Sequence, residues 1–208
     1  MKKLLALLLL AALGSSPALA QPAPQFGITA GYVPKATYSA VFIGLVPAAS
    51  TTDLFCINGA AAKTIRLQSI RISGSAGTTL SLPVTILRRV TLNTGGTPAS
   101  TTANPANTIS RRDTTQAPPV ATLISWTANP TINDTSPTYI DSAQLAISLT
   151  TMATVGNIVL FDWAKDTENN LQPPTIRNGQ TTQQICANLN STSLASGLLT
   201  GSITWIEE

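Results

Sequence analysis

The chain has 208 residues, of which 10% are charged and none is histidine, and its formal net charge is +3. The missing histidine excludes Ser-His-Asp and Cys-His nucleophile systems and imidazole metal sites, and it removes the commonest general base. The charge falls from +3 to +1 without Lys2 and Lys3, so nothing predicts binding to nucleic acid. No Gly-rich phosphate loop occurs, and no cofactor or metal ion is expected.

The first twenty residues have the three-part plan of a secretory signal peptide. Lys2 and Lys3 precede an apolar run at 4–13, and Ala18 and Ala20 offer the small side chains that a signal peptidase accepts. Such a run is too short to cross a bilayer. We therefore expect cleavage before Gln21 and export to the periplasm or the medium, with no membrane span in the mature chain.

Residues 21–37 are rich in proline and glycine, which predicts an extended arm. From residue 38 onward, short runs of β-branched and aromatic residues alternate with turn-forming clusters, and no long stretch has helical periodicity. We expect strands at 38–46, 53–58, 63–73, 80–92, 119–127, 143–150, 157–163, 183–190 and 201–207.

One of these runs changes face partway along. Ile65 and Leu67 share one parity, whereas Ile70 and Ile72 share the other. A regular strand would send half of these side chains into water. We therefore expect a one-residue β-bulge near residues 68–69.

The strand pattern predicts an all-β fold for residues 38–208, a two-sheet antiparallel β-sandwich. A jelly roll is the favoured topology, and an immunoglobulin-like sandwich is the alternative. Residues 93–119 interrupt the pattern with a low-complexity insertion of Thr, Ala, Pro, Asn and Ser. A loop of this kind is functional or disordered, and we assign no secondary structure to it from the sequence.

The two cysteines, Cys56 and Cys186, are 130 residues apart. Export would place them where disulfides form and persist, so we expect a disulfide, with two buried free thiols as the alternative. Neither arrangement makes them catalytic, because a redox pair needs close spacing and a nucleophilic cysteine needs a neighbouring base.

Two arginine pairs bracket the insertion, Arg88-Arg89 before it and Arg111-Arg112 within it. Guanidinium groups bind acidic partners bidentately, which makes these four residues candidates for partner binding. The alternative is that they cap loops or pair with nearby acids such as Asp113. Arg88 also lies at an apolar parity of its strand, which predicts either an overhanging strand end or a buried carboxylate partner.

Trp126 and Trp163 are candidates for stacking against a glycan, although both lie at the apolar parity of predicted strands, which favours core packing. Carboxylate pairs such as Glu207 and Glu208 are conceivable in a glycosidase, but neighbouring acids of this kind are usually solvated. We therefore expect no catalytic residues and no enzyme activity.

Three pieces carry a resemblance to known proteins: residues 87–97 with an arginine-bearing strand before Gly95-Gly96, residues 125–131 (Ser-Trp-Thr-Ala-Asn-Pro-Thr), and the ending Ile-Thr-Trp-Ile-Glu-Glu at 203–208. In this order they resemble uncharacterised proteins encoded in bacteriophage genomes, over about residues 53–208. The resemblance implies a virion-associated or accessory β-sandwich and supplies no catalytic residues. The leader departs from it, since a virion subunit that assembles in the cytoplasm has no evident need for export.

The sequence thus predicts a non-enzymatic structural or surface protein. The first hypothesis is a phage-type virion accessory subunit, for capsid decoration or as a fibre component, which would place it on the virion surface. The alternative is an exported bacterial adhesin or carbohydrate-binding module. The expected partners are further copies of the chain, with a trimer the first form to consider, and a larger protein assembly or a cell surface.

Overall fold

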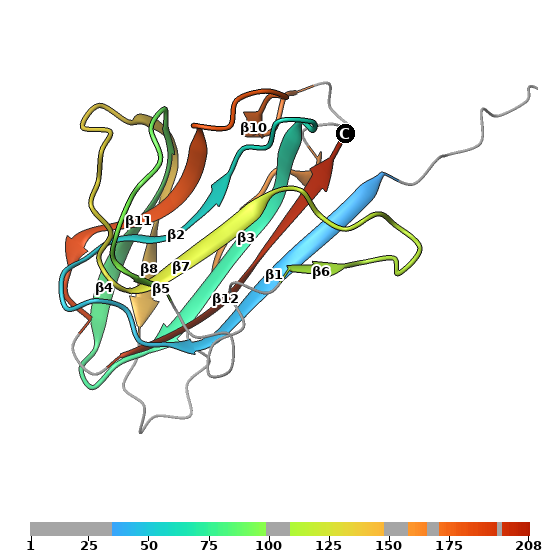
Figure 1. Ribbon diagram of the computed structural model, residues 1–208. Helices are drawn as coiled ribbons and strands as arrows, with labels where there is room; N and C mark the ends of the chain where they lie inside the picture. The colour runs from blue at the N-terminus through green and yellow to red at the C-terminus, as the bar shows by residue number, and fades with distance from the viewer. Residues whose placement is uncertain (1–34, 99–108, 148–157, 166–170, 195–196) are drawn as a thin grey trace, which may run out of the picture. The chain divides into compact units, whose positions relative to one another are not determined.

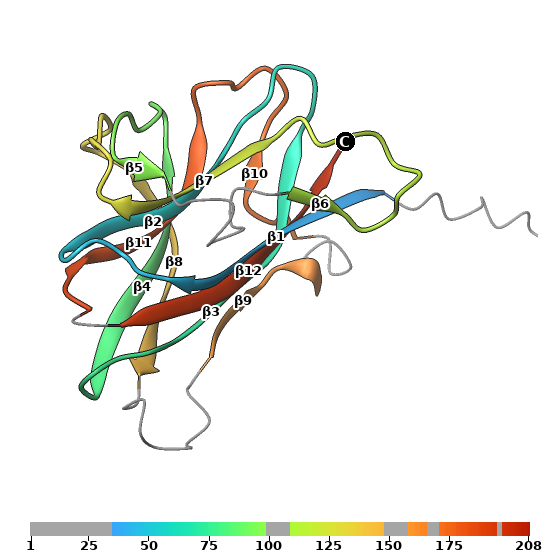
Figure 2. The ribbon, with the colours of Figure 1, turned by 60° about the horizontal axis from the view of Figure 1, so that its bottom comes forward.

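A computed structural model describes residues 35–98, 109–147, 158–165, 171–194 and 197–208. The elements of these residues are all β-strands, and they form two antiparallel six-stranded sheets that pack against each other (Figure 1; Figure 2). The predicted β-sandwich is confirmed. No helix within the described residues is long and apolar enough to cross a membrane. The predicted leader, with its cleavage site at Ala18, Ala20 and Gln21, lies outside the described residues.

Sheet A has the spatial order β10-β3-β12-β1-β6, and β9 also pairs with β3. Its strands are β1 (Ala36–Leu45), β3 (Ile65–Ser75), β6 (Ile109–Arg111), β9 (Val159–Asp162), β10 (Thr175–Ile176) and β12 (Leu198–Glu207). Sheet B has the order β5-β7-β2-β11-β4-β8. Its strands are β2 (Thr51–Asn58), β4 (Leu80–Arg89), β5 (Thr97–Pro98), β7 (Thr122–Ala128), β8 (Thr138–Ile147) and β11 (Gln184–Thr192).

The pairing of the longer strands is that of a jelly roll. Strands β1, β2, β3 and β4 pair antiparallel with β12, β11, β9 and β8 respectively, as in a long hairpin. This hairpin is rolled up so that β12 also pairs with β3 and β11 with β4. The favoured topology is therefore observed and the immunoglobulin-like alternative is not.

The segment between β4 and β8, which includes the insertion at 93–119, contributes to both sheets. Its strand β7 pairs with β2 and carries β5, which extends sheet B, and its strand β6 pairs with β1, which extends sheet A. β5 and β6 thus lie within 93–119, to which the sequence pattern assigned no strands. These short strands form because the edges of β7 and β1 offer unpaired backbone groups.

Two further boundaries differ from the expected ones. β1 begins at Ala36, inside the predicted arm, because Ala36 and Thr37 pair with β12. β8 begins at Thr138 rather than near residue 143, since its first residues pair with the arginine-bearing end of β4.

The predicted bulge in β3 is confirmed. Thr204 of β12 lies opposite Ser69, whereas the next residue, Trp205, lies opposite Leu67, so Gln68 is the extra residue. The bulge turns Leu67 and Ile70 toward the same interior, where both are at most 1% exposed.

The main core lies between the sheets. Phe42 of sheet A packs against Phe55 of sheet B with ring centroids 5.7 Å apart, and Tyr38 stacks on Trp205 at 6.0 Å. None of these four rings is more than 2% exposed. The burial of these four rings shows that this part of the space between the sheets is a closely packed core.

Candidate functional site

Part of the outer surface of sheet B, over β2, β11 and the end of β4, is buried. Its side chains include a small apolar cluster, separate from the main core, in which none of Cys56, Leu87, Trp126 and Cys186 is more than 4% exposed. Asp53 and Arg89 lie beside this cluster and are equally buried. We call these six residues the covered face.

The insertion fits closely over the covered face at Gly96. The backbone there has a φ of 74°, and an added Cβ would lie 2.9 Å from both Cδ1 of Trp126 and the carbonyl oxygen of Ala128. A side chain is therefore excluded by conformation and by space. This explains the Gly95-Gly96 turn in structural terms.

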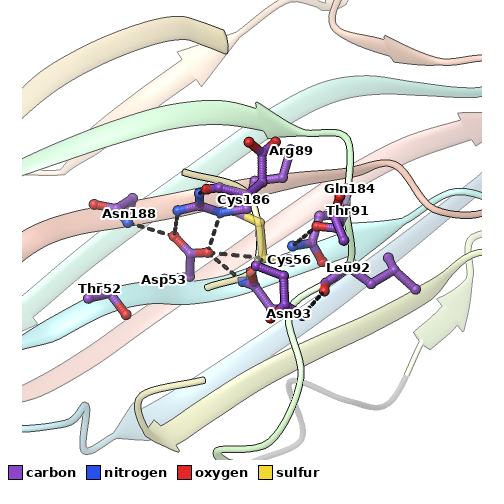
Figure 3. A network of polar contacts seen from close by, with 12 residues as sticks. Thr52, Asp53, Cys56, Arg89, Thr91, Leu92, Asn93, Gln184, Cys186 and Asn188 are labelled. Carbon is purple, nitrogen blue, oxygen red and sulfur yellow. Dashed lines mark hydrogen bonds and ion pairs between the residues drawn. A yellow bond between two sulfur atoms is a disulfide. The ribbon is translucent and has the colours of Figure 1, made fainter. Parts of the chain in front are cut away.

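Asp53 and Arg89 form a buried, bidentate ion pair (Figure 3). Nε and Nη2 of Arg89 donate to the two carboxylate oxygens of Asp53, at 2.7 and 2.9 Å, and Nη1 donates to the carbonyl oxygen of Asp134 at 2.8 Å. The side chains are 0% and 3% exposed. The Arg89 guanidinium is therefore buried and paired inside the protein rather than presented on its surface.

Two amides complete the surroundings of the Asp53 carboxylate. Asn188 of β11 and Asn93 of the insertion both donate hydrogen bonds to it, as Figure 3 shows. A buried ion pair stabilises a fold only when further hydrogen bonds satisfy its remaining lone pairs, and these two amides do so. Because Asn93 lies in the insertion, the network also fastens the insertion to sheet B.

Asp134 anchors the return of the insertion toward β8. Its carboxylate accepts hydrogen bonds from the backbone N–H groups of Val90 and Ser136, at 2.7 and 2.9 Å. These two hydrogen bonds, and then the nearby charge of Arg89, lower the pKa of Asp134 below its ordinary value of 3.8. The Asp134 side chain is thus ionised in the folded protein at neutral pH.

Cys56 and Cys186 lie directly opposite each other on β2 and β11, with their sulfur atoms 1.94 Å apart. The predicted pairing is confirmed as a disulfide within sheet B. Both sulfurs lie within 4.8 Å of an Asp53 carboxylate oxygen, and such a group is also a potential set of metal ligands. The bond between the sulfurs and the guanidinium on Asp53 already satisfy these atoms, so the arrangement is structural.

The structure does not gather the four candidate arginines into one site. Arg111 donates to the carbonyl oxygen of Gln116, and Arg112 donates to the hydroxyl of Thr204, both on the β6 side of sheet A. Arg88 is half-buried and donates to the carbonyl oxygen of Thr175 at 2.9 Å. The carboxylate partner expected for Arg88 belongs instead to Arg89.

Arg88 does share a hollow with Trp163. This open hollow, of about 320 Å³, lies between β8 and the segment before β10. Its lining consists of Arg88, Ile140, Trp163, Gln172, Pro173, Pro174 and Thr175. It combines the guanidinium of Arg88 and the indole of Trp163, which the sequence offered as separate candidates, with the amide of Gln172.

The tryptophans and terminal acids are mostly internal. Trp126 is 4% and Trp163 8% exposed, which leaves little ring surface for a glycan to stack on. Glu207 is buried and accepts hydrogen bonds from Trp205 Nε1 and from the backbone N–H groups of Val120 and Ala121. Glu208 pairs with Lys35 and Arg66, and these two cations lower the pKa of its carboxyl. Neither glutamate is placed as a catalytic carboxylate.

The outer surface of sheet A differs from the covered face, because aliphatic side chains stand out from it into solvent. They are 42% to 59% exposed, and the side chains that lie between them on β3 and β12 include small, hydroxyl-bearing ones. We call this surface the open face, and define it by the aliphatic residues Val41, Ile43, Ile158, Leu160 and Leu198 and the floor residues Ser73, Thr200 and Ser202.

Sequence reasoning missed the open face, although a signal for it exists. In β1 the residues Ala40 and Phe42 point into the core, and Val41 and Ile43 point outward with apolar side chains as well. The same two-sided pattern occurs from Ile158 to Phe161. A strand that is apolar on both faces predicts that both faces contact protein.

Comparison of the chain with protein families, with curated proteins and with solved structures finds no match to any of them. The resemblance to phage-encoded proteins therefore stays a prediction from the sequence.

Proposed function

We propose that this chain is a non-enzymatic structural subunit of the phage virion-accessory type, used for capsid decoration or in a fibre. The open face carries this proposal, because contiguous aliphatic side chains on a soluble domain mark a surface that another protein covers. Four such side chains, each more than 40% exposed, lie on β1, β9 and β12 of one sheet, and a fifth, Ile158, directly precedes β9.

Two further observations support a structural role. The chain lacks histidine, and the polar groups of the covered face form hydrogen bonds that hold the insertion in place. Jelly rolls also occur in viral capsid proteins, although the same fold occurs in lectins and therefore does not decide the function.

The test is the location of the chain in the organism that encodes it. Phage particles released from its cells are purified on a density gradient and examined by mass spectrometry and by immunogold labelling. We expect peptides of residues 35–208 at a constant ratio to the major capsid protein. Absence of the chain from particles, with recovery from the periplasm or the cell surface, would overturn the proposal.

The second candidate is an exported surface adhesin or carbohydrate-binding module, and the hollow that joins Arg88, Trp163 and Gln172 favours it. The Arg88 guanidinium that lines this hollow suits the carboxylate of an acidic sugar. Binding on a glycan array that is lost in Trp163→Ala and kept in Trp126→Ala would support this candidate. An array without binding would exclude it.

A further inference from the structure

The open face is a shallow trough between two rows of aliphatic side chains, a shape that another β-sheet can pack against. Val41 and Ile43 of β1 form one aliphatic wall, and Ile158 and Leu160 at β9 form the other. Between the walls, β12 and β3 present the hydroxyl groups of Ser73, Thr200 and Ser202, together with the side chains of Arg71 and Leu198. Two hollows of about 340 and 430 Å³ adjoin along this floor, sharing Ser73, Ile158 and Thr200.

The register places the two walls opposite each other. Val41 faces Ser202, which faces Arg71, which faces Leu160. In this row the small Ser202 lies beside the long Arg71, whereas in the next row both central residues, Thr200 and Ser73, are small. An aliphatic wall of another sheet can enter this trough, where its side chains would lose contact with water.

The charges of the open surface decide which partner fits. Arg71 of β3 and Asp162 of β9 both point outward and are exposed, and they lie in neighbouring rows of the sheet, since Arg71 faces Leu160 and Ser69 faces Asp162. A partner surface with charges of one sign would be repelled by either Arg71 or Asp162. A second copy of the chain, related by a two-fold axis, would place its Asp162 beside Arg71 and its Arg71 beside Asp162.

We propose that the open face is the docking surface for a second copy of this chain, with sheet A packed on sheet A. The inference rests on the proposed structural function only in that both use this face. The copies are equivalent, so each contributes an aliphatic wall and a trough, and the charges of Arg71 and Asp162 pair between them.

The size of the surface sets the expected strength. β1 and β12 have ten residues each and β3 has eleven. At about 3.3 Å per residue and about 4.8 Å between strands, the area from β1 to β9 measures about 33 by 14 Å. That is roughly 460 Å², well below the about 800 Å² that a stable specific interface buries on each partner, so the contact belongs to the weak, transient class. We therefore expect two isolated copies to associate reversibly, and the dimer to be stable only within a larger assembly.

The first experiment is sedimentation velocity of the purified protein from roughly 5 to 200 μM, a range suited to an interface of this size. We expect a monomer that becomes a dimer as the concentration rises. Leu160→Asp should weaken this association by about tenfold or more. Leu171→Asp is the matched control, because Leu171 is also an exposed leucine, at 61%, and lies off the open face. Unchanged thermal unfolding shows that both variants fold.

Charge reversal then tests the orientation. Arg71→Asp and Asp162→Arg should each weaken the homodimer, whereas a mixture of the two variants should form a heterodimer with all charges paired. A monomer at every concentration, equal effects of Leu160→Asp and Leu171→Asp, or a trimer that ignores both reversals would overturn the inference. If the chain is found in virions but is a monomer in solution, the docking proposal fails and the structural function stands. If the chain forms the dimer but is absent from virions, the structural function fails and the docking proposal stands.

Discussion

The covered face on the outside of sheet B is buried, whereas the open face on the outside of sheet A is exposed to solvent. On sheet B the insertion covers a disulfide, an ion pair and Trp126, so that an outward-facing leucine such as Leu87 is 2% exposed. On sheet A the outward-facing Leu160 is 52% exposed. The comparison shows that the burial of an outward-facing strand residue depends on whether a segment remote in the sequence packs over it. Where no segment of the chain does so, we expect a partner protein to bury the surface.

The largest expected effect comes from the carboxylate of the covered face. Asp53→Asn should lower the free energy of unfolding by about 3 to 5 kcal/mol, because it leaves the Arg89 guanidinium buried without a counter-charge. Asp162→Asn is the matched change on sheet A and should cost at most about 0.5 kcal/mol. Urea unfolding measures both. Equal losses would mean that Asp53 is not enclosed.

Removal of the disulfide is the next largest change. The paired substitution Cys56→Ala and Cys186→Ala should cost about 2 to 4 kcal/mol, since the bond closes a long loop in the unfolded chain. Thiol labelling of the native protein without reductant should detect no free cysteine. Full labelling of both residues would contradict the disulfide.

A smaller effect is expected at Asp134, and it depends on pH. The lowered pKa means that the ionised carboxylate stabilises the fold above pH 3.8, and that this stability is lost as the pH falls below that value. Asp134→Asn should therefore lower the free energy of unfolding by about 1 to 2 kcal/mol at pH 7 and by much less at pH 3. A difference that is the same at both pH values would count against this role.

The smallest effect is expected at the chain end of sheet A. Glu208→Gln removes the contacts with Lys35 and Arg66, which are partly exposed. Such pairs contribute at most about 1 kcal/mol and are screened by salt. The cost should therefore shrink in high salt, whereas the cost of Asp53→Asn should not. A salt-independent loss at Glu208 would show that this pair is more enclosed than its exposure indicates.

The sequence was informative where side-chain parity has one interpretation. The change of parity between Leu67 and Ile70 permits only a bulge, and export predicts the pairing of Cys56 with Cys186. It was uninformative where tertiary contacts decide. Arg89, not Arg88, meets Asp53, because the choice depends on which side of β4 the insertion covers.

The short strands β5 and β6 were missed for a similar reason. Their residues have no apolar pattern of their own, and they pair only because β7 and β1 present free edges. The open face was missed because a two-sided apolar strand does not reveal which side faces the core.

One measurement tests the contrast between the two outer surfaces most directly: the free energy of unfolding of Leu87→Ala and Leu160→Ala, compared at a protein concentration low enough to keep the chain monomeric. The residue and the change are the same in both variants, and only the cover differs. We expect a loss of about 2 kcal/mol or more for Leu87→Ala and about 0.5 kcal/mol or less for Leu160→Ala. Similar losses for the two variants would contradict the division into a covered and an open face.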